Sequence, residues 1–240
     1  MNNLNSFRVS FVLLFALVAS MLLVTTRANE AEHDHAQHDQ AQEATGEFQE
    51  GKHYHRISPA VPTDVKAGSV EVLELFWYGC PHCYQFEKYL TSWMQEKAAN
   101  VEFMRIPAVL NRSWVPHARA YYALEAMGEI ERIHPIFFAA IHEQGRRLHD
   151  MDSMARFLTQ HGIDGKEFKK AYDSLYVETK TKRAKQLVLQ YGSSSVPAVI
   201  INGKYRSTAS DAGSYERLLQ LINQLAQQEA NLSASSETIE

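Results

Sequence analysis

The chain has 240 residues, of which 45% are hydrophobic, so it is long and apolar enough to bury a substantial core as one domain or as a domain with a large insertion. Its formal net charge is −4 at pH 7, and nothing in this composition indicates a nucleic-acid-binding protein. It contains two cysteines, Cys80 and Cys83.

The N-terminus has the pattern of an export signal. Arg8 precedes the almost wholly apolar run Val9–Val24, and Ala28 follows at a suitable cleavage position. The apolar run is short for a membrane span, and an uncleaved anchor is the alternative. No cysteine follows the run, which excludes a lipoprotein. We predict a signal peptide over residues 1–28.

Residues 29–51 are rich in Ala, Gln, Glu and His and lack an apolar period, which predicts a disordered linker. Clustered imidazoles can bind zinc, copper or nickel, so a metal-binding tether is an alternative. We favour a solvated tether without a metal site, because a histidine tract without fixed geometry binds weakly. The histidines concerned are His33, His35, His38, His53 and His55.

The domain proper is expected to start near Lys52. Tyr54–Ile57 is compatible with a short edge strand, and Ser69–Trp77 with the central strand of a sheet. If helices cover both faces of that sheet, Glu74 is a buried carboxylate near the cysteines. Buried carboxylates have raised pKa values and serve as proton acceptors, so we hypothesise that Glu74 relays the proton of Cys83 through water. The alternative is a glutamate at the edge of the core that reaches solvent.

The two cysteines lie where this strand ends and a helix begins. Apolar residues recur with a helical period after Cys83. Pro81 suits the first helical position, where its missing N–H is no loss. Cys80 is then the N-cap, and Cys83 lies one turn further along the same side.

This placement predicts redox chemistry. Unpaired amides at a helix N-terminus carry partial positive charge, and protonated His82 would add to it, so Cys80 should be an acidic, partly exposed, attacking thiol. Cys83 is placed to resolve a mixed disulfide formed at Cys80. A stabilised thiolate makes the disulfide more oxidising, and the Pro81-His82 pair therefore favours an oxidant.

Three other interpretations of the cysteine pair are weaker. A structural disulfide that closes a two-residue loop would constrain little chain. A zinc site would need a second pair of ligands, and the sequence has no other cysteine. Haem attachment would need histidine after the second cysteine, where Tyr84 stands.

The segment VLELFWYGCPHCYQFE, residues 72–87, strongly resembles the active site of the DsbA family of bacterial periplasmic thiol:disulfide oxidases. The segment SSVPAVIING, residues 194–203, resembles the second landmark of that family, and the resemblance extends over about residues 51–228. It implies a thioredoxin-like α/β fold with a central mixed β-sheet and an inserted helical domain. It also matches Glu74 to a buried acid near the second cysteine. Glu87 has a similar match but a weaker case, because an exposed helical glutamate is ordinary.

Val101–Pro107 is expected to be the next strand, so that the helix after Cys80 forms the crossover of a β-α-β unit. Residues 111–192 contain no convincing strand and are expected to form a helical insertion. Pro135 implies a kink or a late start in one of these helices, and Asp164 with Glu167 resembles a capping box. The family resemblance implies that the insertion is a cap over the sheet, beside a groove at the disulfide.

After Gly192 the chain returns to strands. Asn202-Gly203 between Ala198–Ile201 and Lys204–Ser207 predicts a β-hairpin with a type I′ turn. The resemblance implies that Pro197 is cis and faces the cysteines, which would leave the backbone of Val196 to pair with an extended substrate.

A final helix is expected to be capped by Ser210 or Asp211. These signals divide the chain into a two-part thioredoxin-like domain, residues 52–110 and 193–228, around the insertion 111–192. A disordered tail is expected over residues 229–240.

The sequence therefore predicts an exported periplasmic protein that donates the Cys80–Cys83 disulfide to newly exported proteins with free thiols. No cofactor is expected beyond this redox-active disulfide, and a monomer is expected. Apolar groove contacts would select substrates loosely. The resemblance implies reoxidation by a DsbB-like membrane quinone reductase. The alternatives are a periplasmic reductase or isomerase and, less favoured, a His-rich metal-binding protein.

Overall fold

The computed structural model describes residues 48–237, which belong to one compact unit. The predicted signal peptide and the linker as far as residue 47 lie outside the described residues. The described chain forms a five-stranded sheet in the order β1-β5-β4-β2-β3. The strands are β1 His55–Arg56, β2 Val70–Phe76, β3 Val101–Pro107, β4 Ala198–Ile201 and β5 Tyr205–Ser207.

The sheet is mixed. Strands β2 and β3 are parallel, and the helix α1, Pro81–Glu96, connects them as expected. The other neighbouring pairs are antiparallel. The expectation that β2 is the central strand is wrong, because the β4–β5 hairpin pairs along its free side and brings β4 to the middle of the sheet.

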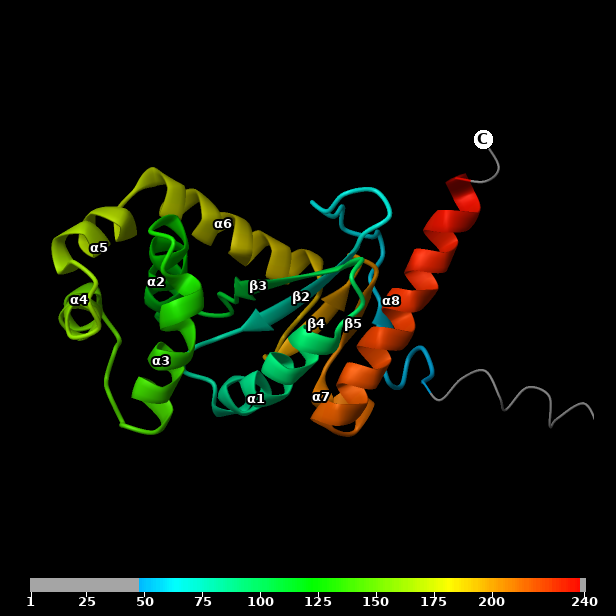
Figure 1. Ribbon diagram of the computed structural model, residues 1–240, viewed down its shortest axis with the longest axis horizontal. Helices are drawn as coiled ribbons and strands as arrows, with labels where there is room; N and C mark the ends of the chain where they lie inside the picture. Colours follow the sequence, from blue (N-terminus) through cyan, green and yellow to red (C-terminus); the bar gives the residue numbers. More distant parts are fainter. Residues whose placement is uncertain (1–47, 238–240) are drawn as a thin grey trace, which may run out of the picture. The chain divides into compact units, whose positions relative to one another are not determined.

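Between β3 and β4 the described chain is helical. Residues 112–190 contain a short 3-10 turn and five α-helices, which gather beyond the end of the sheet where β2 meets α1, while α6 returns toward the sheet (Figure 1). Pro135 lies inside the second of these helices, which nevertheless begins at Ile130, so the late start is excluded. Asp164 caps α5 by accepting hydrogen bonds from the amides of Lys166 and Glu167. The elements are η1 Arg112–Trp114, α2 Val115–Ala126, α3 Ile130–His142, α4 Met151–Thr159, α5 Gly165–Tyr172 and α6 Leu175–Gln190.

Both faces of the sheet are covered. On one face, α1 and the C-terminal helix α8, Tyr215–Glu237, enclose an apolar cluster with Val72 and Val199. On the other face, Leu73 and Ile200 join the apolar side chains of the five-helix cap in a single cluster. All seven residues of β2 are consequently buried, which places the charged Glu74 inside the protein.

The β4–β5 hairpin has the predicted turn. Asn202 and Gly203 both have positive φ, 50° and 63°, as a type I′ turn requires, and the Lys204 amide closes the turn on the Ile201 carbonyl at 3.0 Å. Gly203 also lies against the backbone of Val61, where a Cβ would come within 1.9 Å of the carbonyl oxygen. Glycine is needed here for both reasons.

Three expectations about the ends of the domain need correction. The folded part begins before Lys52, because Phe48 is buried and packs into the cluster beneath α8. The final helix is not capped by Ser210 or Asp211. These two residues belong to the short helix α7, Ala209–Ala212, which Thr208 caps. At the start of α8, Ser214 accepts a hydrogen bond from the Arg217 amide.

The loose tail expected from residue 229 is likewise replaced by helix, since α8 continues to Glu237 and carries the buried carboxylate of Glu229, which accepts hydrogen bonds from Asn202 and Tyr205. No helix among the described residues is long and apolar enough to cross a membrane.

Candidate active site

The cysteines lie at the start of α1, as the sequence predicts. Cys80 is the N-cap with an extended backbone, and Pro81 is the first helical residue. Both cysteines are free thiols, so the structure describes the reduced form of the pair. Cys80 is 9% exposed, which is less than expected, and Cys83 is completely buried. An attacking group from solvent therefore has access only to Cys80.

The two thiols differ in acidity. The pKa of Cys80 is lowered to about 6, chiefly by a hydrogen bond from the Cys83 thiol, with further help from the Cys83 and His82 amides. Burial opposes this shift, and the charge of the exposed His82 contributes least. The sequence interpretation gave His82 more weight and did not include the Cys83 thiol. Burial raises the pKa of Cys83 well above its usual value, and its hydrogen bond to Cys80 and the charge of Glu74 act in the same direction.

Glu74 lies beneath the pair as a fully buried carboxyl group. Its neighbour in the parallel register is Arg105 on β3, whose Nε lies 3.2 Å from Glu74 Oε2. Among the described residues, neither carboxyl oxygen of Glu74 has a hydrogen-bond partner. Burial raises the pKa of Glu74 well above its usual value, and the charge of Glu87 adds to the shift. The alternative of a glutamate that reaches solvent is therefore wrong.

Glu87 makes more polar contacts than the sequence suggested for an exposed helical glutamate. Its carboxylate accepts two hydrogen bonds from Arg105, at 3.2 and 3.0 Å, and its side chain is only 14% exposed. His134 Nε2 on α3 lies 3.2 Å from the same carboxylate. Burial opposes ionisation of Glu87, but the hydrogen bond from His134 and the guanidinium of Arg105 outweigh it and lower its pKa.

Sequence reasoning missed Arg105, His134 and Tyr78. The Tyr78 hydroxyl lies 2.8 Å from His134 Nδ1, and both side chains are buried. A signal for Arg105 existed, since it is a charged residue in an apolar strand that runs parallel to the strand of Glu74. His134 interrupts an apolar helical segment, but nothing in the sequence indicates which partner it meets.

The segment before β4 faces Cys80. The Val196–Pro197 peptide bond is cis, as the family resemblance implied. The Cys80 thiol donates a hydrogen bond to the Val196 carbonyl, with 3.5 Å between sulfur and oxygen. The amide of Val196 makes no hydrogen bond within residues 48–237. The Val196 carbonyl therefore lies at the reactive sulfur.

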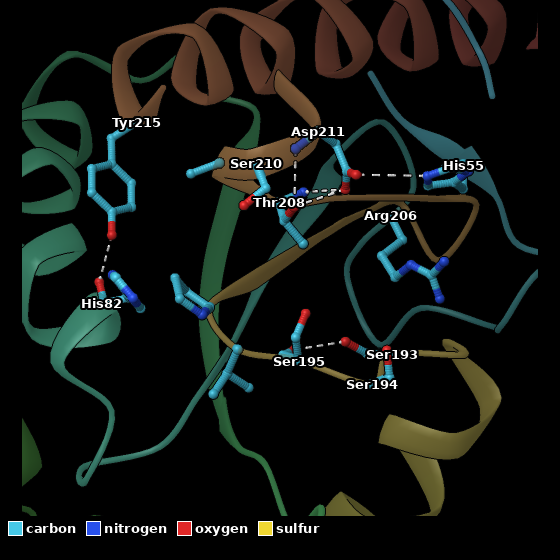
Figure 2. A pocket seen from close by; sticks show the side chains of 13 residues that line it. His55, His82, Ser193, Ser194, Ser195, Arg206, Thr208, Ser210, Asp211 and Tyr215 are labelled. Carbon is cyan, nitrogen blue, oxygen red and sulfur yellow. Dashed lines mark hydrogen bonds and ion pairs between the residues drawn. The ribbon is translucent and has the colours of Figure 1, made fainter. Parts of the chain in front are cut away.

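Beside this segment is a pocket of about 480 Å³, between residues 193–197, the start of α1 and α7. Figure 2 shows it with Tyr215 hydrogen-bonded to the His82 carbonyl on one side and the His55–Asp211 pair on the other. Three consecutive serines, Ser193 to Ser195, and the polar start of α7 line much of it. Most residues that line this pocket are polar, with Val196, Pro197 and Ala209 among the apolar ones. The apolar substrate groove expected from the sequence stays a prediction.

Metal-binding groups are not assembled in the described region. Within residues 48–237, no three His, Cys, Asp or Glu side chains are arranged to hold a metal ion. His53 accepts a hydrogen bond from the Gln49 amide, and His55 lies 3.8 Å from Asp211. His33, His35 and His38 lie outside the described residues.

Comparison with known proteins identifies the family. The family model described as DSBA-like thioredoxin domain matches residues 71–223. The chain belongs to the DsbA family. It is 42% identical over 179 residues to the thiol:disulfide interchange protein DsbA of Azotobacter vinelandii, covering 75% of this chain and 83% of the relative. The DsbA of Pseudomonas aeruginosa strain PAO1 is 37% identical over 183 residues, 76% of this chain and 86% of its own length.

Solved DsbA structures agree with this assignment. The crystal structure of Pseudomonas aeruginosa DsbA superposes with a TM-score of 0.74 at 36% identity, covering 78% of this chain and 97% of that one. The DsbA of Xylella fastidiosa gives a TM-score of 0.70 at 32% identity, with 75% and 96% covered. The expected thioredoxin-like fold is confirmed, and this DsbA-family chain is a thiol:disulfide oxidoreductase.

Proposed function

We propose that this DsbA-family protein oxidises newly exported proteins by donating its Cys80–Cys83 disulfide. The observation that carries the proposal is the asymmetry of the pair, in which a partly accessible, acidic Cys80 lies over a completely buried Cys83. A lowered pKa of the first cysteine stabilises the reduced form relative to the disulfide, and this favours an oxidant over a reductase.

The reaction consists of two thiol–disulfide exchanges. A substrate thiolate attacks the Cys80 sulfur, the Cys80–Cys83 bond breaks, and its electron pair leaves with Cys83, which takes up a proton. A second substrate thiolate then attacks the substrate sulfur of the mixed disulfide, and Cys80 leaves as a thiolate. Its pKa of about 6 makes it a good leaving group at neutral pH. The substrate is oxidised by two electrons, and the cysteine pair is reduced by two.

The surrounding groups have separate roles in this proposal. Glu74 supplies the proton to Cys83, through water, because it is the buried acid whose charge acts on the pKa of that thiol. Val196 and Pro197 hold an extended substrate segment by strand-like pairing. Only the protonated thiol of Cys80 can donate to the Val196 carbonyl, so in the oxidised form that carbonyl is available to the substrate. The polar pocket beside it takes the flanking side chains.

The N-terminal pattern and the family membership support the proposed cellular setting. Residues 1–28 direct export to the periplasm, residues 29–47 act as a tether, and the protein works as a monomer. The reduced pair is returned to the disulfide by a DsbB-like membrane quinone reductase, which accepts its two electrons. No cofactor is required besides the cysteine pair.

The test uses the chain without residues 1–28, which are the proposed leader, in its oxidised form with a reduced, unfolded protein that has two thiols. We expect stoichiometric oxidation of the substrate by the wild type and loss of the reaction in Cys80→Ser. Cys83→Ser cannot form the internal disulfide, so it is mixed instead with the substrate carried as a mixed disulfide with glutathione. Its Cys80 thiolate should displace glutathione and keep the substrate in a trapped mixed disulfide at Cys80. The reduction potential should lie near the roughly −120 mV that characterises DsbA couples. A potential near about −270 mV would indicate a reductase and overturn the proposed direction.

A further inference from the structure

Five buried or nearly buried polar side chains connect the active-site loop with the sheet. Tyr78 precedes the cysteine motif, Glu87 lies on α1, His134 on α3, Arg105 on β3 and Glu74 on β2. Each contacts the next: Tyr78 Oη lies 2.8 Å from His134 Nδ1, and His134 Nε2 lies 3.2 Å from Glu87. Arg105 bonds to Glu87 and lies 3.2 Å from Glu74. Polar contacts therefore run without a break from His134 in the helical cap to Glu74 in the sheet.

The hydrogen-bond pattern fixes the tautomer of His134. Burial lowers the pKa of His134, so the ring is neutral at pH 7 and carries one N–H. The ionised carboxylate of Glu87 only accepts hydrogen bonds, so the N–H is at Nε2. Nδ1 then accepts a hydrogen bond from the Tyr78 hydroxyl, which keeps its proton because burial raises the pKa of Tyr78 well above its usual value. Tyr78 therefore orients the ring with its donor toward Glu87.

The two carboxyl groups share one guanidinium unequally. Glu87 accepts two hydrogen bonds from Arg105 and one from His134. Neither oxygen of Glu74 accepts a hydrogen bond within the described residues, although Arg105 Nε is near. Hydrogen bonds to a carboxylate favour its ionised form, and burial without them favours the protonated form. The negative charge therefore belongs on Glu87, and the proton on Glu74.

We propose that His134, oriented by Tyr78, is a positioning residue that keeps Glu87 ionised and paired with Arg105, so that Glu74 retains the proton which it delivers to Cys83. The delivery step rests on the proposed function, whereas the effect of His134 on Glu87 does not. When the Cys80–Cys83 bond breaks, the Cys83 thiolate takes up the carboxyl proton of Glu74 through water. Glu74 becomes a carboxylate beside Arg105 and regains a proton from water. No electrons move in this transfer.

Other charged and titratable groups face His134 and must be accounted for. They are Tyr78 from the loop, Glu87 from α1, Arg105 from β3, Tyr121 from α2 and Glu131 on the same helix. Tyr121 is buried with a strongly raised pKa and stays neutral over the useful range. Of the remaining groups, only Glu87 hydrogen-bonds the Nε2 side of the ring.

The experiment follows the side-chain carboxyl groups of Glu74 and Glu87 by carbon-13 NMR during a pH titration of the reduced protein. In His134→Leu we expect the Glu87 midpoint to rise by about one pH unit, a tenfold gain in proton affinity. His134→Gln keeps an N–H donor at the position of Nε2 and should restore most of the shift. Tyr78→Phe, which keeps the packing but frees the ring, should raise the midpoint by a smaller amount.

His142→Leu is the matched control. His142 lies on the same helix, and its Nε2 lies 2.8 Å from the Tyr78 carbonyl. The histidine that hydrogen-bonds Glu87 is His134. We expect its Glu87 midpoint to equal that of the wild type. An unchanged midpoint in His134→Leu and Tyr78→Phe, or an equal shift in His142→Leu, would overturn the proposal.

Delivery of the proton is tested separately with Glu74→Gln. An unchanged rate of substrate oxidation and an unchanged Cys83 titration in this variant would remove Glu74 from the proposed reaction. The effect of His134 on Glu87 is measured without substrate and would stand. A failure of proton delivery by Glu74 can therefore be told apart from a failure of the proposed effect of His134 on Glu87.

Discussion

At the scale of single residues, burial makes two chemically identical thiols unequal. Cys80 keeps 9% of its surface exposed and receives hydrogen bonds from the Cys83 thiol and nearby amides, so its thiolate is stabilised. Cys83 has no exposed surface, and its pKa is raised well above the usual value by burial and by its acidic neighbours. The same contrast sets the order of attack and resolution in the proposed reaction.

The acidity of Cys80 predicts a pH-dependent stability of the reduced protein. Its folded pKa of about 6 lies below the ordinary value of 9.0, so the thiolate stabilises the fold fully above pH 9 and this contribution is lost as the pH falls through 6. We expect the free energy of unfolding of the reduced wild type, relative to reduced Cys80→Ser, to grow between about pH 6 and pH 9.

Denaturant unfolding under reducing conditions measures the free energy of unfolding at each pH. Ultraviolet absorbance of the thiolate measures the ionisation of Cys80. A difference between wild type and Cys80→Ser that is constant across this pH range would contradict the assignment. The oxidised wild type is the control, because its Cys80 cannot ionise.

At the scale of elements, the site is assembled where secondary structures begin and end. Strand β2 ends just before the cysteines, α1 starts at Pro81, and residues 193–197 bring Val196 against Cys80 before β4 begins. The β4–β5 hairpin holds this arrangement, since β4 pairs with β2 in a defined antiparallel register. The tight turn at Asn202-Gly203 fixes the register between β4 and β5.

The turn of this hairpin predicts a sharp effect of Gly203→Ala. The residue needs a positive φ of 63°, and a Cβ would meet the Val61 carbonyl at 1.9 Å. We expect a loss of about 2 kcal/mol or more in the free energy of unfolding, because conformational strain adds to a backbone clash. Gly128→Ala is the control, since its φ is also positive, 72°, and no atom lies within 4 Å of the added Cβ.

Gly128→Ala should show only the cost of placing a Cβ residue at positive φ, about 1 kcal/mol. Chemical denaturation of both variants in the same redox state gives the comparison. Equal losses in the two variants would mean that the close approach to Val61 has no energetic weight.

At the scale of the whole molecule, the helical cap shares its core with the sheet. Leu73, Phe76 and Cys83 belong to the same buried cluster as Phe137 of α3 and Phe157 of α4. The described residues accordingly form one compact unit, although the cap is an insertion in the sequence. The division of the sequence into separate domains at residues 110 and 193 remains a prediction.

A shared core predicts cooperative unfolding. Phe137→Ala, at a fully buried position in the cap, should cost about 3–5 kcal/mol and destabilise the amides of α4 and β4 together. Leu221→Ala, in the cluster on the other face of the sheet, is the matched comparison and should also give one transition. Hydrogen exchange measured along the chain checks this, and earlier exchange of α4 alone in Phe137→Ala would show that the cap unfolds separately.

The sequence by itself determined the features that depend on neighbouring residues. The Cys80–Cys83 pair at a helix start, Pro81 as the first helical residue and the Asn202-Gly203 turn were all predicted and are present, because a cap or a tight turn is set by a few consecutive residues. For Glu74 the sequence placed the side chain on an apolar face of the strand but left open whether that face is covered, and the packing of helices on both faces decided its burial.

Only the tertiary structure decided which distant groups meet. His134 bonds to Tyr78 and Glu87, which are 56 and 47 residues away in the chain, and no periodicity encodes that meeting. The pocket lined by Val196 and Pro197 has its mostly polar residues because residues 193–197 and α7 converge there. Local patterns specify which sulfur reacts. Which of the surrounding carboxyl and imidazole groups carry protons depends on contacts that exist only once the cap, α1 and the sheet have packed together.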